Sequence, residues 1–133
     1  WKMINGKWYY LNNDMKTGWI KDNNKWYYLS SNGEMLTGWQ KVNDKWYYLN
    51  NDMKTGWQLI DNKWYYLNQN GVMLSGWQKI NGSWYYLNND MKTGWIKLNN
   101  IWYYLESNGK MVTGTHIING QKYYFDQNGK WIK

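Results

Sequence analysis

The chain has 133 residues, which fits one domain, and 13 Trp and 14 Tyr accompany a single Phe, with no Pro and no Cys. The formal net charge of +7 favours an acidic partner such as nucleic acid, an anionic wall polymer or a membrane surface. The lack of Cys excludes disulfide staples, and no apolar run reaches the roughly 18 residues needed for membrane insertion. Because the apolar side chains are largely aromatic with a polar tip, we expect many half-buried contacts in place of one large core.

An internal repeat runs along the chain. The block Asn-Asn-Asp-Met-Lys-Thr-Gly-Trp occurs identically at residues 12–19, 50–57 and 88–95. Within that period, Trp-Tyr-Tyr-Leu runs follow one another at alternating spacings of 18 and 20 residues. These spacings predict one domain over residues 1–133, with seven repeats that start near residues 1, 19, 39, 57, 77, 95 and 115.

Each repeat is predicted to form a β-hairpin. A pair of residues able to adopt positive φ lies just before each Trp-Tyr-Tyr run, as is typical of a two-residue type I′ turn. One hairpin alone is marginal in water, so seven in series must stack. The prediction is an all-β fold, a β-solenoid of stacked hairpins, rather than a β-sandwich, whose strands seldom repeat so closely. The turn pairs are Asn5-Gly6, Asn23-Asn24, Asn43-Asp44, Asp61-Asn62, Asn81-Gly82, Asn99-Asn100 and Asn119-Gly120.

The predicted turn determines which side chains share a face. With a turn at 23–24, Trp19 pairs with Tyr28, so Trp19, Trp26 and Tyr28 lie on one face. Tyr27 and the Leu that ends the run lie on the other face, which is expected to form the packing core. Three π-faces at a seam between hairpins suit a quaternary ammonium group, at about 0.5–2 kcal/mol per wall. The alternative is that these rings only pack the hairpins together.

The repeat resembles the choline-binding repeat of Gram-positive bacterial and phage cell-wall proteins. The resemblance rests on Gly-Trp, then seven residues on Trp-Tyr-Tyr-Leu, then Asn-Gly-x-Met-x-Thr-Gly-Trp, over essentially the whole chain. It implies a left-handed solenoid in which two Trp of one hairpin and a Tyr of the next enclose each choline, with a Met nearby. It also implies a non-catalytic, secreted and cell-wall-associated module, or part of a phage lysin, that binds choline or phosphocholine on teichoic or lipoteichoic acid.

Carried onto this chain, the resemblance implies six cages, in which the second Tyr of each run is chosen because it shares a face with the Trp pair. The six trios are Trp1, Trp8 and Tyr28; Trp19, Trp26 and Tyr48; Trp39, Trp46 and Tyr66; Trp57, Trp64 and Tyr86; Trp77, Trp84 and Tyr104; and Trp95, Trp102 and Tyr124. One Met in each of six repeats either completes a cage or fills a packing gap, the second being favoured. These residues are Met15, Met35, Met53, Met73, Met91 and Met111. In the seventh repeat Thr115 and Lys122 replace the Trp pair, which predicts a terminal cap.

Other functions remain as alternatives. Carboxylates lie mainly in turns and His116 is the only His, so no catalytic residue, metal site or cofactor is expected; by resemblance, a wall hydrolase would be fused outside the chain. Carbohydrate is the main alternative ligand, because the lost Trp pair also resembles glucan-binding repeats. Nucleic acid is disfavoured since none of the 16 basic residues is Arg, and a structural spacer is a further alternative. An open solenoid end would expose a stacking face, which leaves a homodimer open.

Overall fold

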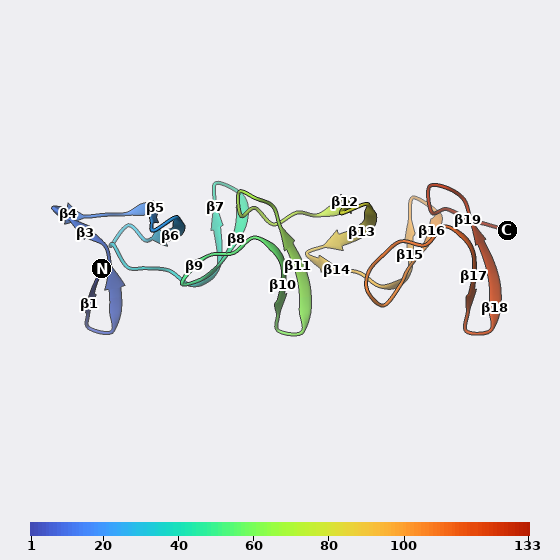
Figure 1. The fold of residues 1–133 in the computed structure, drawn as a ribbon, viewed down its shortest axis with the longest axis horizontal. Coiled ribbons are helices and arrows are strands. Elements are labelled where there is room, and N and C mark those ends of the chain that lie inside the picture. Colours follow the sequence, from blue (N-terminus) through green and yellow to red (C-terminus); the bar gives the residue numbers. More distant parts are fainter. The chain divides into compact units, whose positions relative to one another are not determined.

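The computed structural model describes residues 1–133 and consists of β-strands and connecting turns. Seven antiparallel hairpins follow one another along the chain (Figure 1). Their strands are β1 (Lys2–Ile4) with β2 (Lys7–Tyr9), β5 (Gly18–Asp22) with β6 (Lys25–Leu29), β7 (Gly38–Val42) with β8 (Lys45–Asn50), β10 (Gly56–Ile60) with β11 (Lys63–Leu67), β12 (Gly76–Ile80) with β13 (Ser83–Asn88), β15 (Gly94–Leu98) with β16 (Ile101–Leu105), and β17 (Gly114–Ile118) with β18 (Gln121–Phe125).

Short strands in the connectors return the chain to the hairpin it has just left. β3 (Leu11–Asn12) pairs with β4 (Asp14–Met15), while β9 (Asp52–Met53), β14 (Asp90–Met91) and β19 (Trp131–Ile132) pair with β8, β13 and β18. The three longer connectors do the same through single bridges, Leu29 to Met35, Leu67 to Met73 and Leu105 to Met111. Every Met of the repeat therefore lies opposite the Leu that ends its hairpin.

The hairpin turns have the backbone that the sequence predicts. In the second hairpin Asn23 and Asn24 have φ values of 51° and 64°, which is the left-handed region that a type I′ turn requires. The other six turn pairs also have positive φ at both positions. The register follows from the turn, with Trp19 opposite Tyr28 and Lys21 opposite Trp26. Both the predicted turns and the predicted register are confirmed.

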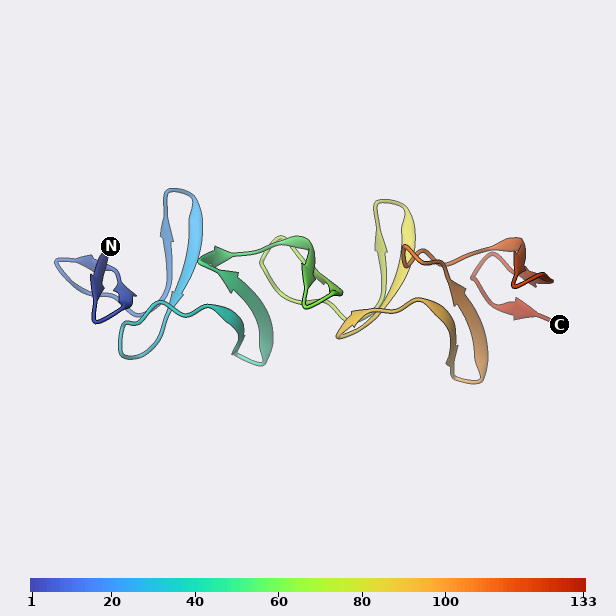
Figure 2. The ribbon, with the colours of Figure 1, turned by 90° about the horizontal axis from the view of Figure 1, so that it is seen from below.

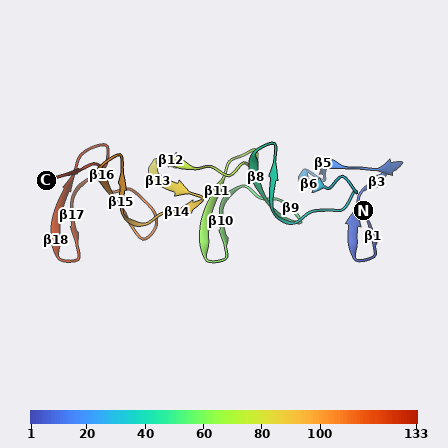
Figure 3. The same cartoon turned by 180° about the vertical axis from the view of Figure 1, so that it is seen from behind.

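The chain divides into two compact units, which are described separately. The first comprises Trp1–Gln58 and Tyr66–Met73, and the second comprises Leu59–Tyr65 and Leu74–Lys133. In the first unit the turns of β5–β6 (light blue) and β7–β8 (teal) point to different sides (Figure 2). In the second unit β15–β16 precedes the last long hairpin, β17–β18 (Figure 3).

The most deeply buried side chains lie at the end of the Trp-Tyr-Tyr run in six of the seven repeats. Five Leu and one Phe at this position are at most 1% exposed, whereas Leu11 in the first repeat is 44% exposed. The buried residues are Leu29, Leu49, Leu67, Leu87, Leu105 and Phe125. In the second unit Phe125 also forms a cluster with Val112 and Ile118. The face expected to hold the core does so, and the Trp pairs are left on the opposite face.

Two kinds of feature are absent from the structure. None of its elements is a helix long and apolar enough to cross a membrane. No group of three or more His, Cys, Asp or Glu side chains is placed where it could hold a metal ion.

Candidate functional site

Two indoles form a right-angled corner on one face of the hairpin. The ring centroids of Trp19 and Trp26 are 6.4 Å apart with an interplanar angle of 86°. Trp39 and Trp46 repeat this geometry at 6.4 Å and 86°. Trp26 is 39% exposed even though it carries a large apolar ring. The corner is therefore open on one side, and a guest there would contact two π-faces.

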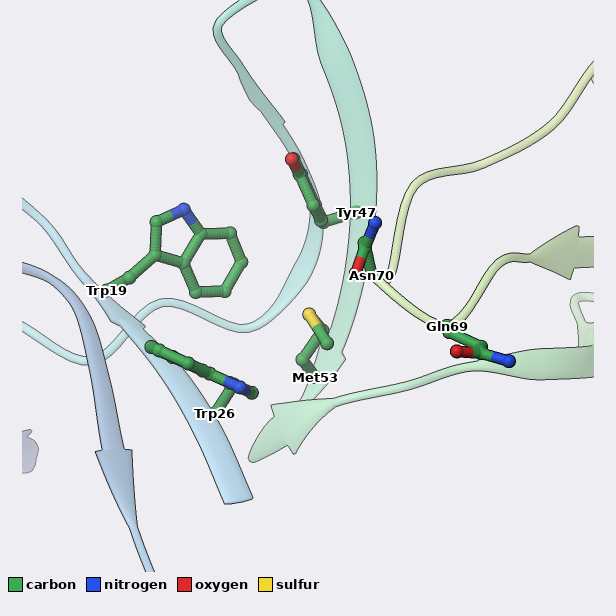
Figure 4. Close-up of a pocket in the computed structure, with 6 residues that line it drawn as sticks. All are labelled: Trp19, Trp26, Tyr47, Met53, Gln69 and Asn70. Carbon is green, nitrogen blue, oxygen red and sulfur yellow. The ribbon is translucent and has the colours of Figure 1, made fainter. Parts of the chain in front are cut away.

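The third wall comes from the first Tyr of the next hairpin. The Tyr47 ring lies 4.9 Å from Trp19, and Trp19, Trp26 and Tyr47 line one pocket (Figure 4). The same contact recurs between the other described pairs, Trp1 with Tyr27 at 4.8 Å, Trp77 with Tyr103 at 5.0 Å and Trp95 with Tyr123 at 4.9 Å.

The sequence prediction of the second Tyr as the third wall is corrected by this placement. Tyr28 packs against Trp19 of its own hairpin, with ring centroids 4.8 Å apart. The other second Tyr residues do likewise: Tyr48 with Trp39, Tyr66 with Trp57, Tyr86 with Trp77 and Tyr104 with Trp95, at 5.0–5.2 Å. Tyr124 lies opposite Thr115 and is 54% exposed.

The physical reason is the direction of stacking. When equivalent hairpins stack head to tail, one face of each hairpin meets the opposite face of the next. The Trp pair and the second Tyr occupy one face, so the neighbour approaches with the other face, which carries the first Tyr and the buried Leu. Tyr47 is therefore both a core-face residue of its own hairpin and a wall of the preceding corner.

A Met from the following connector closes the corner. In the pocket of Figure 4, Met53 lies beside Trp26, and the connector residues Gln69 and Asn70 form the far rim. Two more pockets share this plan: Trp1, Trp8, Tyr27, Met35 and Asn51, and Trp77, Trp84, Tyr103, Met111, Gln127 and Asn128. Their volumes are about 330 and 280 Å³, against about 290 Å³ for the pocket of Trp19 and Trp26. Each cage is thus assembled from consecutive repeats.

Backbone hydrogen bonds hold the Met of the longer connectors at the cage. The amide of Met35 donates to the carbonyl of Trp8, and that of Met111 to the carbonyl of Trp84, each at 2.8 Å. Met73 donates in the same way to Trp46. These bonds join the connector of one hairpin to the second Trp of the hairpin before it, so the cage geometry is built into the main chain.

The Met side chains also fill space, so their two predicted roles coincide. The Met53 sulfur packs where a Cβ on Gly71 would be, and the Met111 sulfur packs in the same way on Gly129. Met53 and Met111 both line a cage. Met15 and Met91 pack on Gly33 and Gly109.

The remaining Trp residues of the predicted trios keep the corner geometry in part. Trp95 and Trp102 form a corner at 6.1 Å and 87°. Trp57 lies on β10 beside Tyr66, with ring centroids 5.0 Å apart. Trp64 lies on β11 and is 41% exposed.

Two kinds of residue near the Trp corners were missed from the sequence. The rim amides each belong to the connector two hairpins beyond the Trp pair, which no local pattern could assign; they are Asn51, Gln69, Asn70, Gln127 and Asn128. Trp131 was missed as well, although it could have been found. The run Asn-Gly-Lys-Trp at 128–131 matches Asn-Gly-Lys-Met at 108–111, so Trp131 stands at the Met position.

In three corners the second Trp already contacts an ammonium group. Lys21 Nζ lies 5.8 Å from the Trp26 centroid, and Lys41 and Lys97 lie 5.9 and 5.6 Å from Trp46 and Trp102. These ammonium groups already use the negative π-faces in the way a bound cation would. Burial, and next the negative charges of Asp52 and Asp22, raise the pKa of the Tyr27 phenol, so this wall stays neutral well into the alkaline range.

His116 has a structural contact. Its Nε2 lies 2.9 Å from the carbonyl oxygen of Thr113. The Nε2 amides of Gln40, Gln58 and Gln78 contact the carbonyl three residues before them in the same way, at 2.8–2.9 Å. His116 thus takes the place of a Gln that braces the start of the hairpin.

Comparison with known families identifies the repeat. The model of the choline-binding repeat matches residues 16–53, 54–91 and 92–130, and a cell wall binding repeat model matches residues 1–14. No curated protein sequence matches the chain.

Solved structures agree with the family models. Choline binding protein F of Streptococcus pneumoniae, in the presence of a peptidoglycan analogue, is 48% identical with a TM-score of 0.93 over 100% of this chain and 46% of that one. CbpJ of the same organism is 47% identical, with a TM-score of 0.92 over 99% and 47%. The pneumococcal cell wall endolysin of phage Cp-1 is 32% identical, with a TM-score of 0.59 over 88% and 37%.

The chain spans less than half the length of these relatives. Its hairpins stack as in choline binding protein F, and the family models cover nearly all of its residues. The chain therefore belongs to the choline-binding repeat family of cell-wall-binding modules.

Proposed function

We propose that this chain attaches a larger protein to a bacterial cell wall by holding phosphocholine groups of teichoic or lipoteichoic acid in its aromatic cages. The observation that carries the proposal is the pocket of Trp19, Trp26, Tyr47 and Met53, together with its two counterparts in other repeats. Three aromatic faces and a thioether suit a cation that is easily desolvated and offers no hydrogen bond.

In this proposal one choline lies in each corner formed by a Trp pair. The third wall is the first Tyr of the next hairpin, as at Tyr27, Tyr47 and Tyr103. The sequence pattern extends the assignment to the Trp pairs at 39 and 46 and at 95 and 102. Relatives support the ligand class, because choline binding protein F has been solved with the choline analogue ipratropium and the phage Cp-1 endolysin with choline.

Weak single sites are sufficient for this function. Walls worth about 0.5–2 kcal/mol each give dissociation constants on the order of millimolar for one choline. A polymer with many choline groups converts the second and later contacts into intramolecular ones, and avidity then gives stable attachment. The protein would be secreted to the wall, and any wall-cutting activity would reside outside residues 1–133.

The test is a titration with free choline, followed by calorimetry and Trp fluorescence, with glucose, a glucan and a short oligonucleotide as controls. We expect a saturable response to choline with several equivalents bound per chain, and Trp26→Ala should remove one of them. Trp46→Ala should remove a second equivalent independently. A response to the glucan alone would assign the Trp rows to sugar stacking, and silence with all ligands would make the chain a structural spacer.

A further inference from the structure

The surroundings of the last Trp pair differ in composition from those of the other pairs. Trp95 and Trp102 form the usual corner, 6.1 Å apart at 87°, and Tyr123 of the last hairpin lies 4.9 Å from Trp95. In the preceding cage of this unit the next component is Met111, opposite Leu105. In the last cage the residue at that register, opposite Phe125, is Trp131.

Trp131 faces the other rings of this corner. Its centroid lies 5.9 Å from Trp95 and 5.7 Å from Tyr123, in both cases edge to face. Trp95 thus contacts both Trp102 and Trp131, and Tyr123 contacts both Trp95 and Trp131. Trp131 therefore adds a fourth aromatic ring to the group formed by Trp95, Trp102 and Tyr123.

The Trp131 ring is held in place and can attract a cation. It packs against the cluster of Val112, Ile118 and Phe125 and is half-buried. Lys133 Nζ lies 5.4 Å from its centroid, which shows that a π-face of Trp131 is accessible to an ammonium group. A thioether offers a cation only a polarisable contact, whereas indole has the strongest aromatic quadrupole among side chains.

We propose that Trp95, Trp102, Tyr123 and Trp131 form a four-walled aromatic box that binds quaternary ammonium groups more tightly than the Met-closed cages. This inference rests on the proposed function, since it ranks the sites that the proposed function assigns. The added wall strengthens choline binding about threefold to fivefold over a Met-closed cage. The box would be the first site to fill when choline groups are scarce.

The experiment uses the Trp indole ¹H–¹⁵N signals of the full chain during a choline titration. Trp77 and Trp84 report the Met-closed cage of the same unit and are the internal control for Trp95 and Trp102. We expect the Trp95 and Trp102 signals to move at a choline midpoint about threefold to fivefold lower. In Trp131→Met the two midpoints should coincide, and Trp131→Phe, which keeps an aromatic wall, should retain most of the difference.

Each other outcome has a definite meaning. If Trp95 and Trp102 respond only in Trp131→Met, then Trp131 is a plug and the proposal is wrong. Coincident midpoints in the unmodified chain would also overturn it. If Trp131→Met loosens the last hairpin, the Trp131→Phe titration decides, because Phe keeps an aromatic ring at this position. Silence of every indole signal, including Trp77 and Trp84, would instead refute the proposed choline function.

Discussion

The indole Nε1 of Trp1, in the first repeat, donates a hydrogen bond of 3.1 Å to Oδ2 of Asp22 in the next hairpin. Trp1 is a wall of the cage with Trp8 and Tyr27, so the carboxylate both orients that wall and places negative charge near it. The corresponding position before the turn is apolar in every other repeat, at Ile4, Val42, Ile60, Ile80, Leu98 and Ile118. Asp22 is therefore a positioning residue of this one cage.

Replacing Asp22 by Val, the residue at the same place in the third repeat, should weaken choline binding at the Trp1 cage. We expect a loss of about twofold to fivefold, because one wall loses its anchor and the cation loses a nearby opposite charge. The Trp1 indole ¹H–¹⁵N signal should move upfield and its choline midpoint should rise. Asp44→Asn, in the turn of another hairpin, is the control. An unchanged Trp1 signal would mean that the bond does not persist in solution.

The two Tyr residues of one run should differ in their effect on choline. Tyr47→Leu removes the third wall of the Trp19 and Trp26 cage, and we expect it to cost about 0.5–2 kcal/mol of binding there. Tyr48→Leu removes a partner of Trp39 and should lower the unfolding free energy while leaving the Trp19 and Trp26 titration unchanged. The choline titration of the Trp19 and Trp26 indole signals measures binding in both variants, and urea unfolding measures their stability. The reverse pattern would restore the second Tyr as the cage wall.

The case of Tyr47 marks the limit of what the sequence could predict. Positive-φ pairs such as Asn23-Asn24 determine the turn, the turn determines the register, and alternation then assigns each side chain to a face. All of this is local, and it was predicted correctly, as was the burial of Leu29 and its counterparts in the later repeats, although not that of Leu11. Which face meets which neighbour is a property of the stacking, and no residue within one hairpin encodes it.

Distance along the chain explains the other omissions. Asn70 reaches the cage of Trp19 from a connector two hairpins on, so its role depends on the advance of the whole stack. Trp131 is different, because its alignment with Met111 was present in the sequence. The last repeat lacks the Trp pair, with Thr115 and Lys122 in its place, so the pattern that marks a cage does not lead to Trp131.

Gly129 tests whether the Met position matters to the cage. Gly129 has φ +87°, and a Cβ there would collide with the sulfur of Met111. Gly129→Ala should therefore push Met111 away from Trp77 and Trp84 and raise the choline midpoint of these two signals. It should also destabilise the chain by about 1 kcal/mol through backbone strain alone.

The matched control is Gly120→Ala. Gly120 has φ +80°, but a Cβ there would meet nothing within 4 Å. It should show the backbone strain without the effect on choline. Equal choline midpoints in the two variants would mean that Met111 contributes nothing to binding.

The raised pKa of Tyr27 predicts a loss of stability in alkali. An unperturbed Tyr ionises near pH 10, whereas burial and the charges of Asp52 and Asp22 favour the neutral phenol in the folded chain. Its contribution to stability is complete below about pH 10 and is lost as the pH rises through the raised pKa of the folded state. Urea unfolding at several pH values should show this decline, and Tyr27→Phe should reduce its slope. An identical slope in the variant would contradict the assignment.

The row of buried Leu side chains predicts that the same substitution, Leu to Ala, will have different effects on stability in two repeats. Leu49 is fully buried at the end of its run, while Leu11 occupies the same place in the first repeat and is 44% exposed. Leu49→Ala should lower the unfolding free energy by about 2–5 kcal/mol, because it leaves a cavity in the core. Leu11→Ala should change it by less than about 0.5 kcal/mol. Urea denaturation followed by Trp fluorescence measures both, and equal effects would mean that the row of Leu side chains does not stabilise the stack.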